Sequence, residues 1–246
     1  MKKGQVTLYV IIAIVIVAAV GGFAYLRNIS PKSGEIVTTD VVKTARAAMD
    51  SCAEQSSKDA IMVISLKGGY GFPDYSIPRG IFDVAYWYNQ SNDISPGIDR
   101  LNSELSYVAC SIFVDCINSK NFGSMGNNFT AGNCSAVSNI MTDYTALNLN
   151  YPMSLDSNGK TYIFREFSEK FNVKLGRSFA AAKLIVAEQA KHPDFVCLTC
   201  MANVGVKNNL MIDIGSTENT YILTLTDEES TIYTNQSYEF DFAMKI

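Results

Sequence analysis

The sequence predicts an α+β protein in which a long N-terminal hydrophobic helix precedes an ectodomain of about three helices and a mainly antiparallel sheet. Three observations predict this fold. Residues 6–26 are almost entirely apolar, and three later stretches repeat their apolar residues every three or four positions, as amphipathic helices do. Other stretches alternate apolar and polar residues between turn residues, and strands grouped in hairpins favour an antiparallel sheet.

The apolar segment at residues 6–26 carries no charge. As a helix it would be about 32 Å long, because each residue adds about 1.5 Å, and that length matches the hydrocarbon core of a bilayer. A surface helix of a soluble domain would have a polar face, and this segment has none. Basic residues lie on both sides of the segment, so charge does not fix its orientation. The segment predicts a membrane-spanning anchor.

Three kinds of export segment fit this N-terminus: an uncleaved signal anchor, a secretory signal peptide cut near residues 19–21, and a pilin-like leader. The first residues, Lys-Lys-Gly-Gln-Val-Thr, resemble the short basic leader of archaeal type IV pilin-like proteins with class III signal peptides. The resemblance implies cleavage after Gly4, which makes Gln5 the first mature residue. It also implies that the apolar helix is first a membrane anchor and then the packed centre of a filament. Residues 1–28 are thus a leader and a transmembrane or filament-core helix.

The ectodomain is expected to follow a hinge at residues 29–37, which contains Pro, Gly and Ser without periodicity. It would comprise residues 38–246. Its three helices are expected at residues 40–68, 95–118 and 171–190, where apolar residues follow the helical period.

Strands are expected where β-branched and aromatic residues gather or alternate with polar ones. A Gly-containing turn at residues 156–159 predicts a hairpin. Trp87, the only tryptophan, is expected in the core, and the acidic run at residues 227–229 is expected to be a solvated turn. The expected strands are residues 81–88, 144–151, 161–164, 210–214, 221–226 and 238–243.

An even number of cysteines in an exported chain predicts disulfides. Cys110 and Cys116 cannot bridge each other on one helix, because six residues turn them to different faces. Cys134 is the nearest partner for Cys116, and we expect that bridge. The six candidates are Cys52, Cys110, Cys116, Cys134, Cys197 and Cys200.

The Cys197-Leu-Thr-Cys200 spacing is compatible with thiol exchange, zinc binding or structural bridges. A redox site would lie between a strand and a helix, whereas residues 191–194 end a helix just before this motif. For zinc, His192 and two thiolates give three ligands at most, and no second CxxC follows. We therefore expect Cys197 and Cys200 to bridge to partners elsewhere in the chain, and we expect no metal site and no cofactor.

Five Asn-X-Ser/Thr sequons occur in the chain, and they favour an extracytoplasmic, glycosylated domain when combined with the anchor and the cysteines. The candidate sites are Asn28, Asn89, Asn128, Asn133 and Asn235.

Composition and motifs restrict the function. A net charge of -4 and a pI of about 5.1 give no basic face, which argues against nucleic-acid binding. The chain has no HExxH, GxSxG, Walker or dinucleotide-binding motif, and His192 has no evident nucleophile partner, so we predict no catalytic residue. The leading hypothesis is a non-enzymatic, pilin-like cell-surface subunit that self-associates through residues 6–26. The alternatives are a single-pass anchored receptor or adhesin with an unidentified external partner, and an extracellular hydrolase, because carboxylate pairs need no local motif.

Overall fold

The computed structural model describes residues 40–246, apart from residues 125–127, 158 and 234–236. The predicted leader site at Gly4 and Gln5, the apolar segment, the hinge, and the sequons at Asn28 and Asn235 lie outside the described residues.

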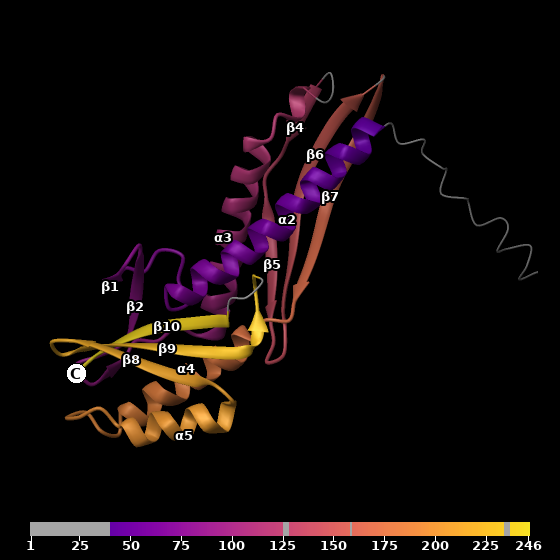
Figure 1. The fold of residues 1–246 in the computed structure, drawn as a ribbon. Coiled ribbons are helices and arrows are strands. Elements are labelled where there is room, and N and C mark those ends of the chain that lie inside the picture. The colour runs from indigo at the N-terminus through magenta and orange to yellow at the C-terminus, as the bar shows by residue number, and fades with distance from the viewer. Residues whose placement is uncertain (1–39, 125–127, 158, 234–236) are drawn as a thin grey trace, which may run out of the picture. The chain divides into compact units, whose positions relative to one another are not determined.

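Figure 1 shows the arrangement of helices and strands along the chain. The helices are α2 (Asp40–Leu66), α3 (Ile98–Ser119), the short 3₁₀ helix η1 (Phe122–Ser124), α4 (Leu175–Gln189) and α5 (Leu198–Asn208). The strands are β1 (Ser76–Arg79), β2 (Phe82–Asn89), β3 (Asn92–Asp93), β4 (Asn128–Ala131), β5 (Ser135–Ile140), β6 (Thr145–Ser157), β7 (Lys160–Phe171), β8 (Met211–Thr217), β9 (Thr220–Thr231) and β10 (Ser237–Lys245).

The described helices and sheets do form an α+β fold, but the predicted fold class is wrong in its number of helices and sheets and in its N-terminal helix. The described residues contain four α-helices and two sheets, where three helices and one sheet were expected. The additional helix is α5, whose 11 residues are too few to show a long apolar period. The expected N-terminal hydrophobic helix is not among the described elements. None of the helices in residues 40–246 combines the length and the apolarity of a membrane span, as judged over the described residues.

The first sheet has six strands in the order β1-β2-β10-β9-β8, with β3 paired to β2. The pair β10–β2 is parallel and the other pairs are antiparallel. Strands β2 and β10 are far apart in sequence, so a parallel pairing between them cannot be read from a hairpin pattern.

The second sheet is built around β6, which alternates buried and less buried residues along its length. Strand β7 pairs with one edge of β6, and β4 and β5 pair with successive parts of the other edge. The predicted hairpin is confirmed: Ser157 pairs with Lys160, and Gly159 has the positive φ of +71° that a tight turn needs.

Helix α2 contacts both sheets. Near its start, the Arg46 guanidinium lies 4.7 Å from the ring centroid of Phe167 on β7. Near its end, the Ser65 hydroxyl lies 2.7 Å from the Tyr238 hydroxyl on β10. The predicted helix is confirmed, and it ends where Gly68 and Gly69 adopt positive φ.

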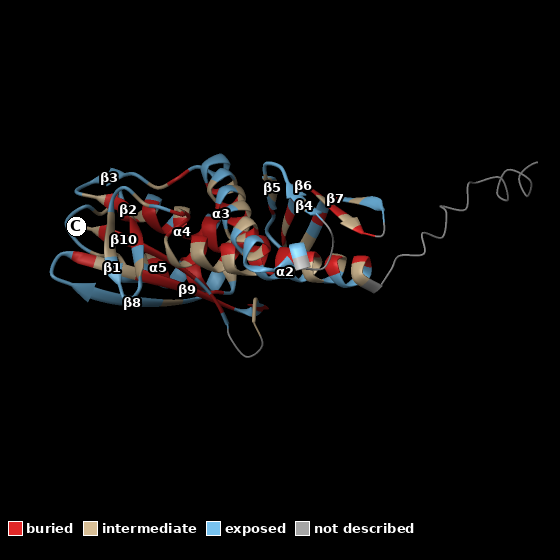
Figure 2. Ribbon diagram, turned by 90° about the horizontal axis from the view of Figure 1, so that it is seen from above, coloured by how far each residue is buried: buried red, intermediate tan, exposed pale blue. Residues whose placement is uncertain are grey.

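Trp87 lies in the core, as predicted, with no exposed surface. Its indole nitrogen donates a hydrogen bond to the Gly68 carbonyl at 2.8 Å. Its ring contacts Phe179 of α4 and Phe240 and Phe242 of β10. Figure 2 shows buried residues on the facing sides of the helices and sheets in this region. Trp87 thus joins the end of α2, the first sheet and α4.

All six cysteines form disulfides, but the expected Cys116–Cys134 bridge is wrong. Cys116 is bonded to Cys52, which joins α3 to α2, and Cys110 is bonded to Cys134, which joins α3 to the segment before β5. Because the two cysteines lie six residues apart on α3, the Cys116 sulfur faces α2 and the Cys110 sulfur faces the segment before β5. Three disulfides indicate an extracellular or secreted location, because such bonds persist in oxidising compartments.

Candidate functional site

The two cysteines of the CxxC motif, Cys197 and Cys200, form a disulfide with each other, and their Cα atoms are 5.3 Å apart. The expectation that each would bond to a partner elsewhere in the chain is therefore wrong. The reason is local: α5 begins at Leu198, so Cys197 is its N-cap residue and Cys200 lies in its first turn. One helical turn brings two side chains three residues apart within bonding distance.

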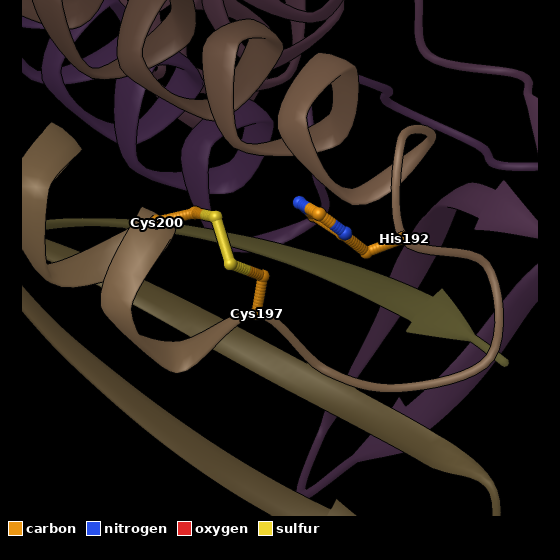
Figure 3. A group of neighbouring side chains, drawn as sticks. All are labelled: His192, Cys197 and Cys200. Carbon is orange, nitrogen blue, oxygen red and sulfur yellow. A yellow bond between two sulfur atoms is a disulfide. The ribbon is translucent and has the colours of Figure 1, made fainter.

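His192 lies beside this disulfide, on the loop that follows α4 (Figure 3). One of its ring nitrogens and the sulfurs of Cys197 and Cys200 lie within 4.8 Å of one another, and all three side chains are half-buried. These are the three ligands that the sequence offers for zinc. Sulfurs bonded to each other are not thiolates, so a metal would require a reduced pair.

Gln189 holds the loop that carries His192 and leads to Cys197. Its side chain is 1% exposed, and its amide nitrogen donates hydrogen bonds to the carbonyls of His192 at 2.7 Å and Phe195 at 2.8 Å. Its amide oxygen accepts a hydrogen bond from the Cys197 backbone at 3.4 Å. Sequence reasoning missed Gln189. The available signal was a polar residue on the apolar face at the end of a helix, directly before a loop.

Two exposed apolar side chains flank the disulfide. Phe195 is 57% exposed and Leu198 is 61% exposed, on either side of Cys197. The ring of Phe195 also lies beside that of His192, with centroids 5.2 Å apart. A cavity of about 390 Å³ adjoins the loop, between Phe195 and Tyr221 of β9. The disulfide is therefore partly exposed and has an apolar border.

The three disulfides differ in how much of the fold they restrain. In the chain-entropy model, closing loops with sequence separations of 64, 24 and 3 residues stabilises by about 4.3, about 3.4 and about 1.6 kcal/mol, respectively. Cys52, Cys110, Cys116 and Cys134 also belong to the core or pack against it. The Cys197–Cys200 bond contributes least to the fold.

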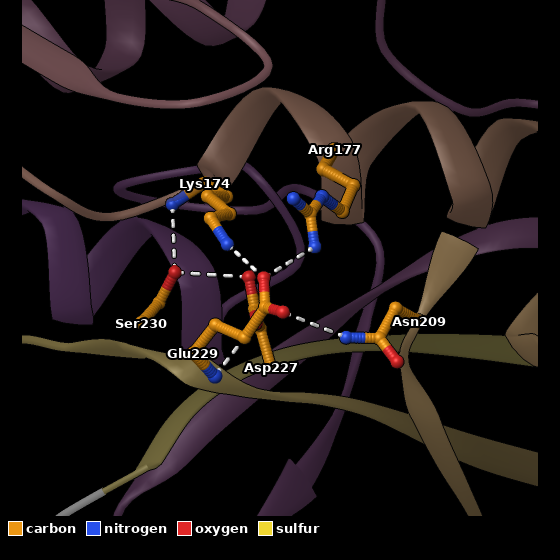
Figure 4. Close-up of polar contacts among 6 residues, drawn as sticks. All are labelled: Lys174, Arg177, Asn209, Asp227, Glu229 and Ser230. Atoms are coloured by element: carbon orange, nitrogen blue, oxygen red, sulfur yellow. Dashed lines mark hydrogen bonds and ion pairs between the residues drawn. The ribbon is translucent and has the colours of Figure 1, made fainter.

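A cluster of charged and polar side chains, separate from the disulfide, lies between the start of α4 and β9 (Figure 4). Glu229 forms ion pairs with Lys174 and with Arg177, the latter at 3.3 Å, and accepts a hydrogen bond from Asn209 at 3.1 Å. The hydrogen bonds from Lys174 and Arg177 lower the pKa of Glu229. The expected solvated turn at residues 227–229 is wrong, because these residues belong to β9.

Asp227, next to this cluster, is fully buried and has partners of its own. Its carboxylate accepts hydrogen bonds from the Glu229 backbone at 3.0 Å and the Ser230 hydroxyl at 2.9 Å. The Lys174 backbone in turn donates to the Ser230 hydroxyl at 3.0 Å. The cluster fastens α4 to β9, and its hydrogen-bonding groups are occupied by one another.

Asp241 of β10 is the other buried carboxylate of the first sheet. The Thr224 hydroxyl donates to it at 2.8 Å, and Arg79 of β1 forms an ion pair with it. Burial raises the pKa of Asp241, and these two partners oppose that change. Asp241 therefore links three strands.

An open apolar groove runs between α4, the start of α3 and the turn after β5, and it encloses about 740 Å³. Phe179 and Ile140 lie in the groove and are mostly buried. Ile98, Met141 and Leu184 are between 41% and 50% exposed around it.

The described sequons differ in exposure. Asn128 and Asn133 are exposed at β4 and just before β5, respectively. Asn89 is half-buried at the end of β2, and its side-chain oxygen is buried without a hydrogen-bond partner.

Comparison with protein-family models, curated proteins and solved structures yields no match to this chain. The fold and the bonds described above therefore define the class: a disulfide-bonded α+β domain of an extracellular or secreted protein.

Proposed function

We propose that the protein is a non-enzymatic, pilin-like structural subunit of the cell surface. Its apolar residues 6–26 hold it at the membrane and associate with copies of themselves, while the disulfide-bonded domain lies outside the cell. The proposal combines the apolar segment and its basic leader with the oxidised domain that follows.

The observation that carries the proposal is the position of α2. This helix begins at Asp40, shortly after the apolar segment in the sequence, and is about 40 Å long at about 1.5 Å per residue. Its contacts reach α3, β6 and β7 of the second sheet, and β10 of the first sheet, and the Cys52–Cys116 bond fixes it to α3. A load applied at Asp40 would therefore be shared by both sheets and one covalent bond, as an attached structural subunit requires.

Self-association can be tested with substitutions in the apolar segment of the full chain. Residues 13, 18, 19, 21 and 22 are Ala or Gly, which allow close approach of neighbouring segments. Gly22→Phe keeps the segment apolar but fills that space, so membrane insertion should persist and the oligomer should be lost. Ile14→Leu conserves volume and is the matched control.

The measurement is particle size in mild detergent and in native membranes, with electron microscopy of surface material. Mass spectrometry of the mature N-terminus would show whether Gln5 is the first residue. A wild-type protein that is monomeric in both settings would contradict the structural-subunit proposal.

The apolar groove beside α4 favours a second candidate, a single-pass anchored receptor or adhesin. Monomeric soluble domains rarely expose large contiguous apolar patches unless these have a function. This candidate needs the same attachment but no self-association, so a monomeric, membrane-bound wild type would support it.

A further inference from the structure

We propose that the Cys197–Cys200 disulfide is a redox-active site that exchanges with the cysteine thiols of a partner polypeptide. The inference concerns a chemical activity of the outer domain and does not depend on the proposed structural role. It rests on the disulfide between the two CxxC cysteines at the start of α5, on its partial exposure, on its apolar border and on the adjacent imidazole.

The first step of the argument is that this bond is dispensable for the fold. It closes a loop with a sequence separation of only 3, so it restricts the unfolded chain little. Helix α5 packs mainly on α4 and β8, and the other two disulfides join α2, α3 and the second sheet. Opening the bond therefore leaves the rest of the covalent framework intact.

The second step concerns access. Thiol–disulfide exchange needs a thiolate to reach a sulfur, and Cys197 lies on a loop between the exposed side chains of Phe195 and Leu198. Cys200 is held within the first turn of α5. Attack is therefore favoured at Cys197. The apolar side chains on both sides suit a polypeptide partner whose cysteines are flanked by apolar residues.

The third step is the position of the sulfur at the N-terminus of α5. Backbone N–H groups that lack partners within the helix stabilise a thiolate there, which makes the sulfur a better leaving group and increases the fraction of the cysteine present as the reactive thiolate. The imidazole of His192, within 4.8 Å of both sulfurs, can supply or accept a proton during exchange.

The exchange balances without further reagents. A partner thiolate attacks the Sγ of Cys197, the bond to Cys200 breaks, and Cys200 leaves as a thiolate that takes a proton. The partner's second thiolate then attacks its own sulfur in the mixed disulfide and releases Cys197 as a thiolate. The partner dithiol loses two electrons and becomes a disulfide, and Cys197 and Cys200 become thiols.

The test uses the full chain in mild detergent and a reduced peptide that contains two cysteines. Each protein molecule should oxidise about one peptide. The Cys200→Ala variant, whose Cys197 is a free thiol, should accumulate a mixed disulfide at Cys197 when it is incubated instead with the disulfide-linked dimer of a single-cysteine peptide, because the Cys197 thiolate attacks that disulfide and releases one peptide thiol. Cys197→Ala/Cys200→Ala should lose peptide oxidation while its circular dichroism spectrum is retained. Cys110→Ala/Cys134→Ala, which keeps the CxxC pair, is the control and should still oxidise the peptide.

A second measurement follows each cysteine separately. The protein is treated with dithiothreitol for increasing times, quenched with acid, alkylated and mapped by mass spectrometry. Cys197 and Cys200 should become labelled about tenfold faster than the four other cysteines, since those four belong to the core or pack against it. Equal or slower labelling of the CxxC pair would overturn the proposal, as would peptide oxidation that persists in Cys197→Ala/Cys200→Ala.

Discussion

Replacing the Cys52–Cys116 pair by alanines is expected to destabilise the protein far more than replacing the Cys197–Cys200 pair. The loop that Cys52 and Cys116 close has a sequence separation of 64, and losing it costs about 4.3 kcal/mol in the chain-entropy model. Cys52 is also 1% exposed, so removing its sulfur loses about 1 kcal/mol of packing. The Cys197–Cys200 loop, with a separation of 3, accounts for only about 1.6 kcal/mol.

These free energies translate into separate melting temperatures. For a folded unit of this size, 1 kcal/mol shifts the midpoint by about 2–4 °C. Cys52→Ala/Cys116→Ala should therefore melt about 10–20 °C below the wild type, and Cys197→Ala/Cys200→Ala about 3–6 °C below it. The assay is thermal unfolding of the full chain in mild detergent, followed by circular dichroism without reductant.

The comparison can refute the reasoning. If both double variants melt at the same temperature, loop length does not govern the contribution of these bonds, and Cys197–Cys200 is a structural bond. If the Cys52–Cys116 variant melts within about 3 °C of the wild type, non-covalent packing between α2 and α3 dominates instead.

Three further substitutions, with Gly215→Ala as a control, test individual contacts by urea unfolding. Gln189→Met removes the donor to the His192 and Phe195 carbonyls and should cost about 1–3 kcal/mol. Gly176→Ala places a Cβ 2.5 Å from the Met141 carbonyl oxygen and should cost about 1–3 kcal/mol, whereas Gly215→Ala, with its nearest contact at 3.9 Å, should cost less than about 1 kcal/mol. Tyr238→Phe should cost about 1 kcal/mol at neutral pH, because Ser65 keeps its bond to the Ile61 carbonyl. Burial raises the pKa of Tyr238 above its ordinary value of 10.0. Above pH 10 the unfolded chain therefore loses the Tyr238 proton before the folded protein does, which favours unfolding. The stability of the wild type should fall more steeply above pH 10 than that of Tyr238→Phe.

The elements with strong local periodicity could be predicted from the sequence. The helix beginning at Asp40 and the hairpin of β6 and β7 follow from apolar period, glycine positions and alternation. The parallel pairing of β2 with β10 could not be predicted, because it joins strands far apart in the chain. The pairing of Cys116 was predicted wrongly, because sequence distance favoured Cys134, whereas the packing of α3 on α2 placed Cys52 closest.

The acidic residues at 227–229 show a different limit of sequence reasoning. A run of acidic side chains indicates a solvated turn on average, yet Asp227 is fully buried in β9. Its burial depends on hydrogen bonds from the Ser230 hydroxyl and the Glu229 backbone N–H, because these bonds offset the free energy of removing a carboxylate from water. Such partners are assembled by the fold and have no local sequence signature.

The proposed redox site also could not be predicted from residue spacing alone. The CxxC spacing was evident in the sequence, but its chemistry depends on where α5 begins and on Gln189, which orders the loop before it. Because the Cys52–Cys116 and Cys110–Cys134 bonds hold α2, α3 and the second sheet, the domain can keep its covalent framework while Cys197 and Cys200 are open. A domain outside the cell that needed only structural bonds would gain little from a third bond across so short a loop. Its placement at an exposed helix start is instead what exchange with a partner thiol requires.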